Sequence, residues 1–399
     1  MKRWKRHNQC LDRIFRTQPE ARDRNEYAAA LLETELLYID AWTGVSHDDD
    51  LLVEWSRWIV DQLPSGMFHD RELRVLIRSA RWCDRIGEFA LATQTYERAI
   101  DLAHRLDRSE WAIQSMEEMG DIFRKQGRYG EAETWQKRAA AEAGQAGLFS
   151  LEAHALNNLG VIDIERGRLD SADVFFQQAL ERLERIPEAL LEGHINNNLG
   201  VLLCIRGKPE RAIAELNRAL LFRSSANDRI GYTETSHNLA LASMETGRLD
   251  DAEMYIDRAL RIAREIGDVA IQANVLLSRA ELFLKRGNAV IAGMVAQEAR
   301  DIVTRIGDPL GHADSLRIAG EAEMALDRYD SAGRILEKAY TMHLQLDHLQ
   351  GIADCARALC HLAASRMDIT AATQWARIAA DAWTKLGNTT AVYTVSDWL

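Results

Sequence analysis

The hydrophobic pattern of this chain repeats every forty residues. Small alanines recur without exception in two series, at Ala92, Ala132, Ala172, Ala212, Ala252, Ala292, Ala332 and Ala372, and at Ala99, Ala139, Ala179, Ala219, Ala259, Ala299, Ala339 and Ala379. The two alanines of one repeat lie seven positions apart, which is two turns along one helix face. A small side chain there lets a second helix approach closely. The pattern therefore predicts a pair of packed helices in each repeat.

Two further series mark the turns. Within repeats they are Gly87, Gly127, Gly167, Gly207, Gly247, Gly287, Asp327 and Met367, and between repeats Asp107, Gly147, Pro187, Asn227, Gly267, Gly307, Asp347 and Gly387. Glycine ends a helix readily because it adopts positive φ without a steric penalty. Proline cannot adopt positive φ, so the junction at Pro187 should turn differently. Asp308 and Pro309 have the order of an N-cap followed by a first helical residue.

The best-preserved unit has Leu-Gly-Val-Ile at 159–162, Gly-Arg-Leu at 167–169, and Ala172, Phe176 and Ala179 beyond them. It resembles the tetratricopeptide repeat (TPR), whose pattern eight units match in part over roughly residues 73–392. Forty-residue spacing and the Leu-Asn-Asn-Leu-Gly segment at 156–160 resemble the longer repeats of kinesin light chains, spindle-orientation scaffolds and Rap-type peptide-sensing regulators. The resemblance implies an all-α, right-handed α-solenoid of about eight helix hairpins in one continuous array.

Some positions depart from the family pattern. Asp163 and Glu323 stand where the family usually packs an aromatic ring, and Arg279 replaces a leucine. Because an unpaired charge is costly to bury, these side chains should reach solvent or loosen the helix contacts.

The two ends of the chain do not follow the repeat. Residues 1–72 are predicted to form an N-terminal helical capping region, with helices at 27–42 and 48–63 that carry Trp55 and Trp58. Residues 393–399, with Trp398 near their end, are predicted to form a short C-terminal capping helix, since an uncapped solenoid end exposes apolar surface. The alternative is an open end that docks a partner.

Composition and charge narrow the partners. The formal net charge of −12 disfavours a broad nucleic-acid surface, so a basic or neutral partner is easier to accommodate. Basic exceptions, interpreted as a solvated tail and a solvated helix face, are Lys2, Arg3, Lys5 and Arg6, and Arg74, Arg78, Arg81 and Arg85. The sequence contains no secretory signal and no bilayer-spanning apolar run, and its five cysteines suit reduced core positions. A cytoplasmic protein without membrane contact is predicted.

Residue patterns for catalysis are missing. The sequence has no glycine-rich phosphate loop, no paired zinc-ligand cysteines and no His-Glu-x-x-His helix. The one metal-like cluster is Cys355, Cys360 and His361, but Cys360 falls at a small buried position of its repeat. His343 and His348 flank a turn and should be solvated. We therefore predict no enzyme, no cofactor and no metal.

The resemblance assigns the concave groove to the first helices of successive units. The predicted partner-binding residues are His154, Asn157, Val161, Ile164, His194, Asn197, Val201, Cys204, His237, Leu241, Met244, Asn274, Arg317 and Arg357. Asn157 and Asn197 can donate and accept hydrogen bonds, as gripping the backbone of an extended peptide requires. The alternative is that the central apolar residues only pack between neighbouring first helices.

Towards the C-terminal end the groove becomes charged. Acidic Glu281, Glu321, Asp314 and Asp354 are expected to face Arg317 and Arg357. Mixed charge of this kind can set peptide register or only keep the face soluble.

These features favour a scaffold or adaptor that holds a peptide or helix of a partner protein in the groove. The alternative is a Rap-like bacterial regulator, in which a bound peptide changes how the N-terminal bundle engages a target. No feature of the sequence supports an enzyme or a nucleic-acid binder.

Overall fold

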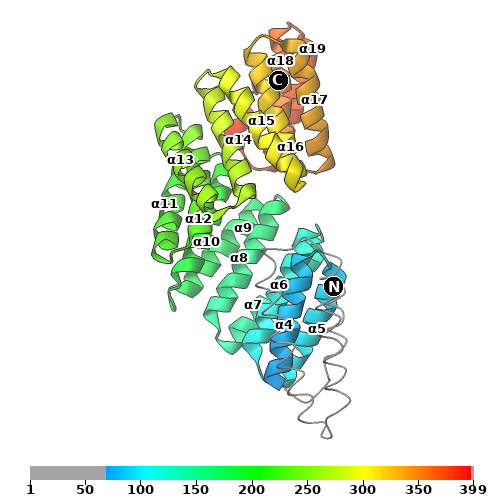
Figure 1. Ribbon diagram of the computed structural model, residues 1–399, viewed down its shortest axis with the longest axis vertical. Helices are drawn as coiled ribbons and strands as arrows, with labels where there is room; N and C mark the ends of the chain where they lie inside the picture. The colour runs from blue at the N-terminus through cyan, green and yellow to red at the C-terminus, as the bar shows by residue number, and fades with distance from the viewer. Residues whose placement is uncertain (1–68, 397–399) are drawn as a thin grey trace, which may run out of the picture. The chain divides into compact units, whose positions relative to one another are not determined.

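The computed structural model describes residues 69–396, and this part of the chain is helical throughout, without a strand (Figure 1). Helices follow one another at close intervals: α4 (His69–Arg85), α5 (Phe89–Arg105), α6 (Ser109–Lys125), α7 (Tyr129–Ala146), α8 (Phe149–Glu165), α9 (Leu169–Leu183), α10 (Ala189–Ile205), α11 (Pro209–Ser225), α12 (Arg229–Glu245), α13 (Leu249–Ile266), α14 (Val269–Lys285), α15 (Ala289–Ile306), α16 (Pro309–Ala325), α17 (Tyr329–Gln345), α18 (Leu349–Ser365), α19 (Ile369–Lys385) and α20 (Thr389–Tyr393). No described helix is long and apolar enough to cross a bilayer.

The predicted helix pairs are confirmed, and the alanine series holds them together. Every alanine of both series is 0% exposed. Glycine serves the same purpose where the helices approach most closely. A Cβ added to Gly200 of α10 would lie 2.6 Å from Leu216 Cδ2 of α11, so only a hydrogen fits there.

The turns also follow the sequence. The non-glycine members of both turn series, apart from Pro187, have positive φ: Asp107, Asn227, Asp327, Asp347 and Met367. Before Pro187 the helix α9 ends early, at Leu183, so this junction does turn differently. Asp308 accepts hydrogen bonds from the backbone N–H groups of Leu310 and Gly311, each at 3.0 Å, and caps α16 as expected.

The chain divides into two compact units, one ending at Ile162 and the other starting at Asp163. In the second unit, neighbouring first helices of the pairs, such as α12, α14 and α16, pack against one another, whereas neighbouring second helices make far less contact. The first helices therefore line the inner side of this unit. We call the surface that α10, α12, α14, α16 and α18 share the inner face.

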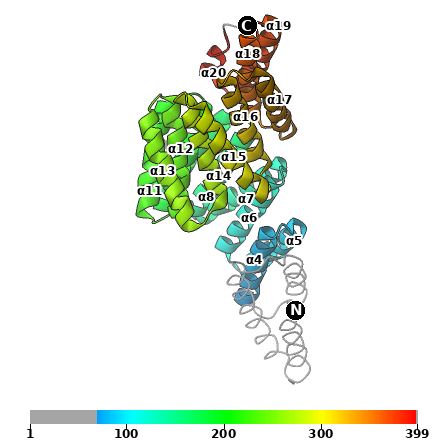
Figure 2. The same ribbon diagram turned by 45° about the horizontal axis from the view of Figure 1, so that its top comes forward.

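Residues after α19 fold back within the second unit. Val395 is 0% exposed in the core of the last pair, and Ile205 from the end of α10 packs against the same cluster. Thr390 donates a hydrogen bond to the carbonyl of Gly207 at 3.5 Å. The short helix α20 packs against α19 of the last pair (Figure 2). The predicted caps at Trp55, Trp58 and Trp398 lie outside the described residues.

At three junctions between repeats, the size of one residue near the end of the second helix is matched by the residue eight positions later. Ala143 is followed by Leu151, whereas the larger Arg223 and His343 are followed by glycines. A Cβ on Gly231 would lie 2.5 Å from Arg223 Cζ, and one on Gly351 would lie 2.5 Å from His343 Cγ. These glycines make room for buried polar side chains at two junctions between repeats.

Candidate functional site

The predicted groove residues differ widely in exposure. Asn157, Asn197, Met244 and Arg317 are buried, Asn274 is exposed, and the partly exposed ones are His154, Val161, Ile164, His194, Val201, Cys204, His237, Leu241 and Arg357. His154, Asn157 and Val161 belong to the first unit, and the others belong to the second. The second unit therefore holds the larger candidate surface, and its inner face combines an amide and hydroxyl region with a charged region.

The amide region is internally hydrogen-bonded. The Asn197 side-chain oxygen accepts hydrogen bonds from Thr235 Oγ1 at 3.1 Å and from Asn238 Nδ2 at 3.0 Å. Asn197 is only 7% exposed, so its carbonyl joins α10 to α12. Asn197 was expected to hold a peptide backbone, and the structure shows it bracing helix against helix instead.

His237 extends this polar surface towards α14. Its Nδ1 lies 3.2 Å from Ser278 Oγ, and burial lowers its pKa to about 4. The ring is therefore neutral at pH 7 and offers one donor and one acceptor. Met244 is 3% exposed and Leu241 partly exposed, so they form an apolar floor beside it.

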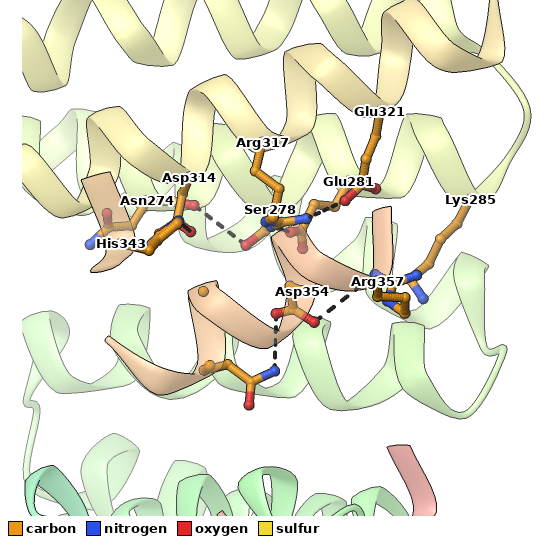
Figure 3. A network of polar contacts seen from close by, with 12 residues as sticks. Asn274, Ser278, Glu281, Lys285, Asp314, Arg317, Glu321, His343, Asp354 and Arg357 are labelled. Atoms are coloured by element: carbon orange, nitrogen blue, oxygen red, sulfur yellow. Dashed lines mark hydrogen bonds and ion pairs between the residues drawn. The ribbon is translucent and has the colours of Figure 1, made fainter. Parts of the chain in front are cut away.

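The charged region centres on Arg317 of α16 (Figure 3). Its guanidinium forms an ion pair with Glu281 of α14 and a second one, at 3.0 Å, with Glu321 one turn further along α16. Arg317 is 8% exposed, and these two carboxylates keep its pKa well above the ordinary value despite burial. A buried guanidinium with two carboxylates is a rigid structural joint rather than a free recognition group.

Asp314 lies one turn before Arg317 and is the least compensated carboxylate of this region. Its Oδ1 lies 3.5 Å from Nε2 of His343, and its side chain keeps 30% exposure. Burial, together with the negative charges of Glu281 and Asp354, raises the pKa of Asp314 to about 7, although Arg317 lowers it. Asp314 is therefore close to half-protonated at neutral pH.

His343 and His348 were expected to be solvated. In the structure His343 is buried and His348 is partly buried. The His343 ring is 0% exposed, and its Nδ1 lies 3.4 Å from Nδ1 of His348. Burial, with His348 and Arg317 nearby, lowers the pKa of His343 to about 4. His348 in turn accepts a hydrogen bond from the Gly351 backbone N–H at 3.2 Å and caps α18. Both rings are structural, because His343 fills the space that Gly351 leaves and His348 caps the helix.

Asp354 and Arg357 complete the region on α18. Asp354 Oδ2 accepts a hydrogen bond from Gln350 at 3.0 Å, and its Oδ1 lies 4.0 Å from the Arg357 guanidinium. Arg357 keeps 34% side-chain exposure, in contrast to the buried Arg317. The two arginines stand at equivalent positions of consecutive repeats but differ in role. Arg317 holds helices together, and Arg357 faces solvent.

A second buried arginine was not predicted from the sequence. Arg223 of α11 is 3% exposed and pairs with Glu234 at 3.1 Å and Asp228 at 3.7 Å. Gly231 in the first turn of α12 makes room for it. A glycine early in a first helix was the available signal, since it marks a large side chain eight residues earlier.

The departures from the repeat pattern are resolved by ion pairs. The Asp163 side chain is 2% exposed and pairs with Arg168, so it does not reach solvent as expected. Glu323 pairs in the same way with Arg328, five residues later, at 3.1 Å. Arg279 pairs with Asp257 at 3.3 Å. Each charge is compensated by a neighbour, which explains why the helix contacts remain tight.

Three of the four described cysteines are buried in the core. Cys355 and Cys360 are buried, and burial raises the pKa of both Cys355 and Cys204 to about 12. Thiols with raised pKa values are weak nucleophiles at neutral pH. Among the described residues, no group of three or more His, Cys, Asp or Glu side chains is arranged to hold a metal ion.

Comparison with known families agrees with this architecture. A tetratricopeptide repeat family model matches residues 68–141 and 151–223, and a second model with the same description matches residues 234–266. The chain contains tetratricopeptide repeats. Helix pairs with the same spacing continue beyond the matched residues to α19, which extends the TPR array towards the C-terminus. No curated protein matches the sequence.

Several solved structures share the fold. The apo quorum sensor NprR from B. thuringiensis has a TM-score of 0.62 at 13% identity, covering 86% of this chain and 93% of its own. A Rap protein in complex with competence and sporulation factor has a TM-score of 0.59 at 16% identity, covering 85% and 91%. The apo form of RapI has a TM-score of 0.58 at 12% identity, covering 69% and 98%. Likeness at this identity shows a common fold.

Proposed function

We propose that this TPR protein is an interaction scaffold whose inner face, in the second unit, binds a peptide or helical segment of another protein. The observation that carries the proposal is the side-by-side arrangement of an apolar and amide surface on α10 and α12 and a charged region on α14, α16 and α18. Repeat arrays present such extended surfaces to partners. Polar groups that converge beside apolar floor residues fix the orientation of a bound segment.

The charged region favours a basic group in the partner. Arg317 already pairs with Glu281 and Glu321, and Asp354 contacts Gln350 and Arg357, which leaves Asp314 as the least compensated carboxylate. A lysine, an arginine or an amino terminus would pair with Asp314, which among the described residues has the buried Arg317 as its compensating cation. The net charge of −12 agrees with a basic partner.

Binding at Asp314 should depend on pH. The pKa of this carboxyl is about 7 in the free protein, and a bound cation lowers it. Binding therefore releases protons near neutral pH, and affinity should fall as pH decreases from 8 to 6. Asp314→Asn removes this dependence because the amide does not titrate.

The test is a selection of random heptapeptides displayed on phage against the full chain. Selected peptides should be enriched in Lys and Arg, and Asp314→Asn should weaken their binding about tenfold, the loss of one charge-assisted hydrogen bond. The control is Asp381→Asn, an identical change on the second helix α19, where the carboxylate is 69% exposed. Equal loss in both variants, or a selection without basic residues, contradicts the proposal.

A second candidate function is a peptide-sensing regulator of the Rap type. The contact between Thr390 and Gly207 favours it, because it joins the last repeat to the early part of the second unit through residues far apart in sequence. A ligand that prefers one state of this contact would shift the conformation of the unit. Fold likeness to NprR and to the Rap protein with competence and sporulation factor supports this candidate by analogy.

Small-angle scattering distinguishes the two functions. A selected peptide that reduces the radius of gyration of the full chain favours the regulator, whereas binding without compaction favours the scaffold. In the regulator, Thr390→Val should also reduce compaction, because it removes the hydrogen bond to the Gly207 carbonyl without changing the size of the side chain.

A further inference from the structure

A cavity of about 430 Å³ is lined by α4 and α6 of the first unit. Most of its wall comes from α4, with Arg74, Arg78, Arg81, Arg85 and Trp82, and Trp111 of α6 lies opposite. The arginines recur at intervals of four, three and four residues, which places them on one helix face. From the sequence, this helix face was expected to be solvated. In the structure it forms one wall of a cavity.

The cavity joins guanidinium groups to aromatic surface. Arg85 lies over the Trp82 ring, with Cζ at 5.4 Å from the ring centroid. Trp82 is 3% exposed and Ile77 6%, so they form a fixed apolar floor, while Trp111 remains partly exposed at the other side. Arg81 pairs with Glu118 at 3.0 Å, which ties α4 to α6 across the cavity. Among the described residues, the cavity is lined by the four arginines, the two tryptophans, Ile77 and Gln114.

We infer that this cavity binds a small organic phosphate that carries a planar ring, such as a nucleotide. Guanidinium groups pair with phosphate oxygens through two parallel hydrogen bonds. The partly exposed indole of Trp111 provides a face on which a planar ring stacks. The volume falls within the range of about 300 to 1,000 Å³ that is typical of small-ligand sites.

The neighbouring repeat excludes a polyanionic chain. Forty residues after Arg78 and Arg81, the equivalent positions on α6 are Glu118 and Asp121. A nucleic-acid strand that continued from α4 onto α6 would therefore leave the arginines and meet these two carboxylates. The basic surface is confined to a single helix and fits one compact anion.

The test is isothermal titration calorimetry on the full chain at low ionic strength, with ADP, adenosine and pyrophosphate as probes. ADP should bind once per chain, and adenosine and pyrophosphate should each bind at least about tenfold more weakly, because each lacks one of the two recognised parts. Added salt should weaken ADP binding. The inference is overturned if ADP gives no heat at millimolar concentration, or if pyrophosphate binds as tightly as ADP.

Variants assign the heat to the cavity. Arg85→Gln should weaken ADP binding at least about tenfold. Its matched control is Arg105→Gln, which removes the same charge from the last turn of the neighbouring helix α5, outside the cavity. Trp111→Leu should also weaken ADP binding, and leucine stands at the equivalent position of the next repeat, at Leu151, so the fold accepts it.

Equal loss in Arg85→Gln and Arg105→Gln, or unchanged binding in Trp111→Leu, refutes the assignment. An acidic peptide that binds where ADP does not would also overturn the ligand class. The peptide selection concerns a different surface, the inner face of the second unit, so failure here leaves the proposed function standing.

Discussion

Gly351 offers a sharp test of how the repeats fit together. It lies in the first turn of α18, where a Cβ would be placed 2.5 Å from Cγ of His343 on α17. The His343 ring is 0% exposed, and His348 and the cap of α18 hold it from the other side. Gly351→Ala therefore forces the ring or the helix to shift.

The magnitude follows from two opposing effects. Alanine stabilises a helix interior by roughly 0.5 to 1 kcal/mol relative to glycine. Overpacking a tight junction costs about 1 to 3 kcal/mol. Gly351→Ala should therefore lower the free energy of unfolding by about 1 to 2 kcal/mol, since the added methyl group has a ring atom within its contact distance.

The control is the same substitution where space exists. A Cβ on Gly333, within α17, would meet Leu362 Cδ2 at 3.4 Å, an ordinary contact, so Gly333→Ala should stabilise the protein slightly. Urea unfolding followed by circular dichroism measures both. In a His343→Ala background, Gly351→Ala should lose its penalty. The steric explanation is refuted if the urea midpoint of Gly351→Ala is at or above that of Gly333→Ala. It is also refuted if Gly351→Ala loses as much stability in the His343→Ala background as in the natural sequence.

Three further predictions concern stability. Ala172→Leu inserts volume where two helices touch and should cost about 1 to 3 kcal/mol in urea unfolding, and an unchanged midpoint would show that the repeat register is wrong. Arg168→Ala leaves the buried Asp163 carboxylate unpaired and should cost about 1 to 3 kcal/mol, against no measurable loss if that pair were solvated. His343, with a folded pKa of about 4 below its ordinary 6.5, contributes stability above pH 6.5 that is lost as pH falls towards 4, by at most about 3 kcal/mol. In His343→Asn the melting temperature should fall less over that pH interval, and an identical fall would exclude this histidine as the cause.

The helix pairs were predictable from sequence because their causes are local. These helices end at residues with positive φ, such as Gly127 and Asp327. Residue types that adopt this conformation can be recognised in the sequence. A close approach of two helices needs a small side chain, and alanines such as Ala172 and Ala212 mark these positions in the sequence. Because each of these residue types recurs every forty residues, the same local signal is seen eight times. The helix pairs can therefore be predicted without information on long-range contacts.

The inner face was less predictable because its contacts join residues about forty positions apart. Asn197 was expected to offer its amide to a partner, yet its oxygen is occupied by Thr235 and Asn238. His343 was expected in solvent, yet its ring fills the space above Gly351. Whether a polar side chain points to a partner or to the next helix depends on rotamers and on the size of its neighbours, which a repeat pattern does not encode.

The charge of the inner face was predictable in kind but not in detail. The sequence placed Arg317 and Arg357 at equivalent positions, and only the structure separates the buried joint at Arg317 from the exposed Arg357. A comparison of neighbouring repeats supplied one usable signal. Gly231 marks the large buried Arg223 eight residues earlier, in the same way that Gly351 marks His343.

The central claim is that a partner segment lies on the inner face of the second unit, and photo-crosslinking tests it most directly. A peptide selected on the full chain, with benzoylphenylalanine next to its basic residue, is irradiated in the complex, and the crosslinked residues are identified by mass spectrometry. The proposal predicts crosslinks on α14, α16 and α18 near Asp314, Asp354 and Asn274, with loss of crosslinking in Asp314→Asn. Crosslinks confined to the second helices, or to the chain ends near Trp55 or Trp398, would contradict it.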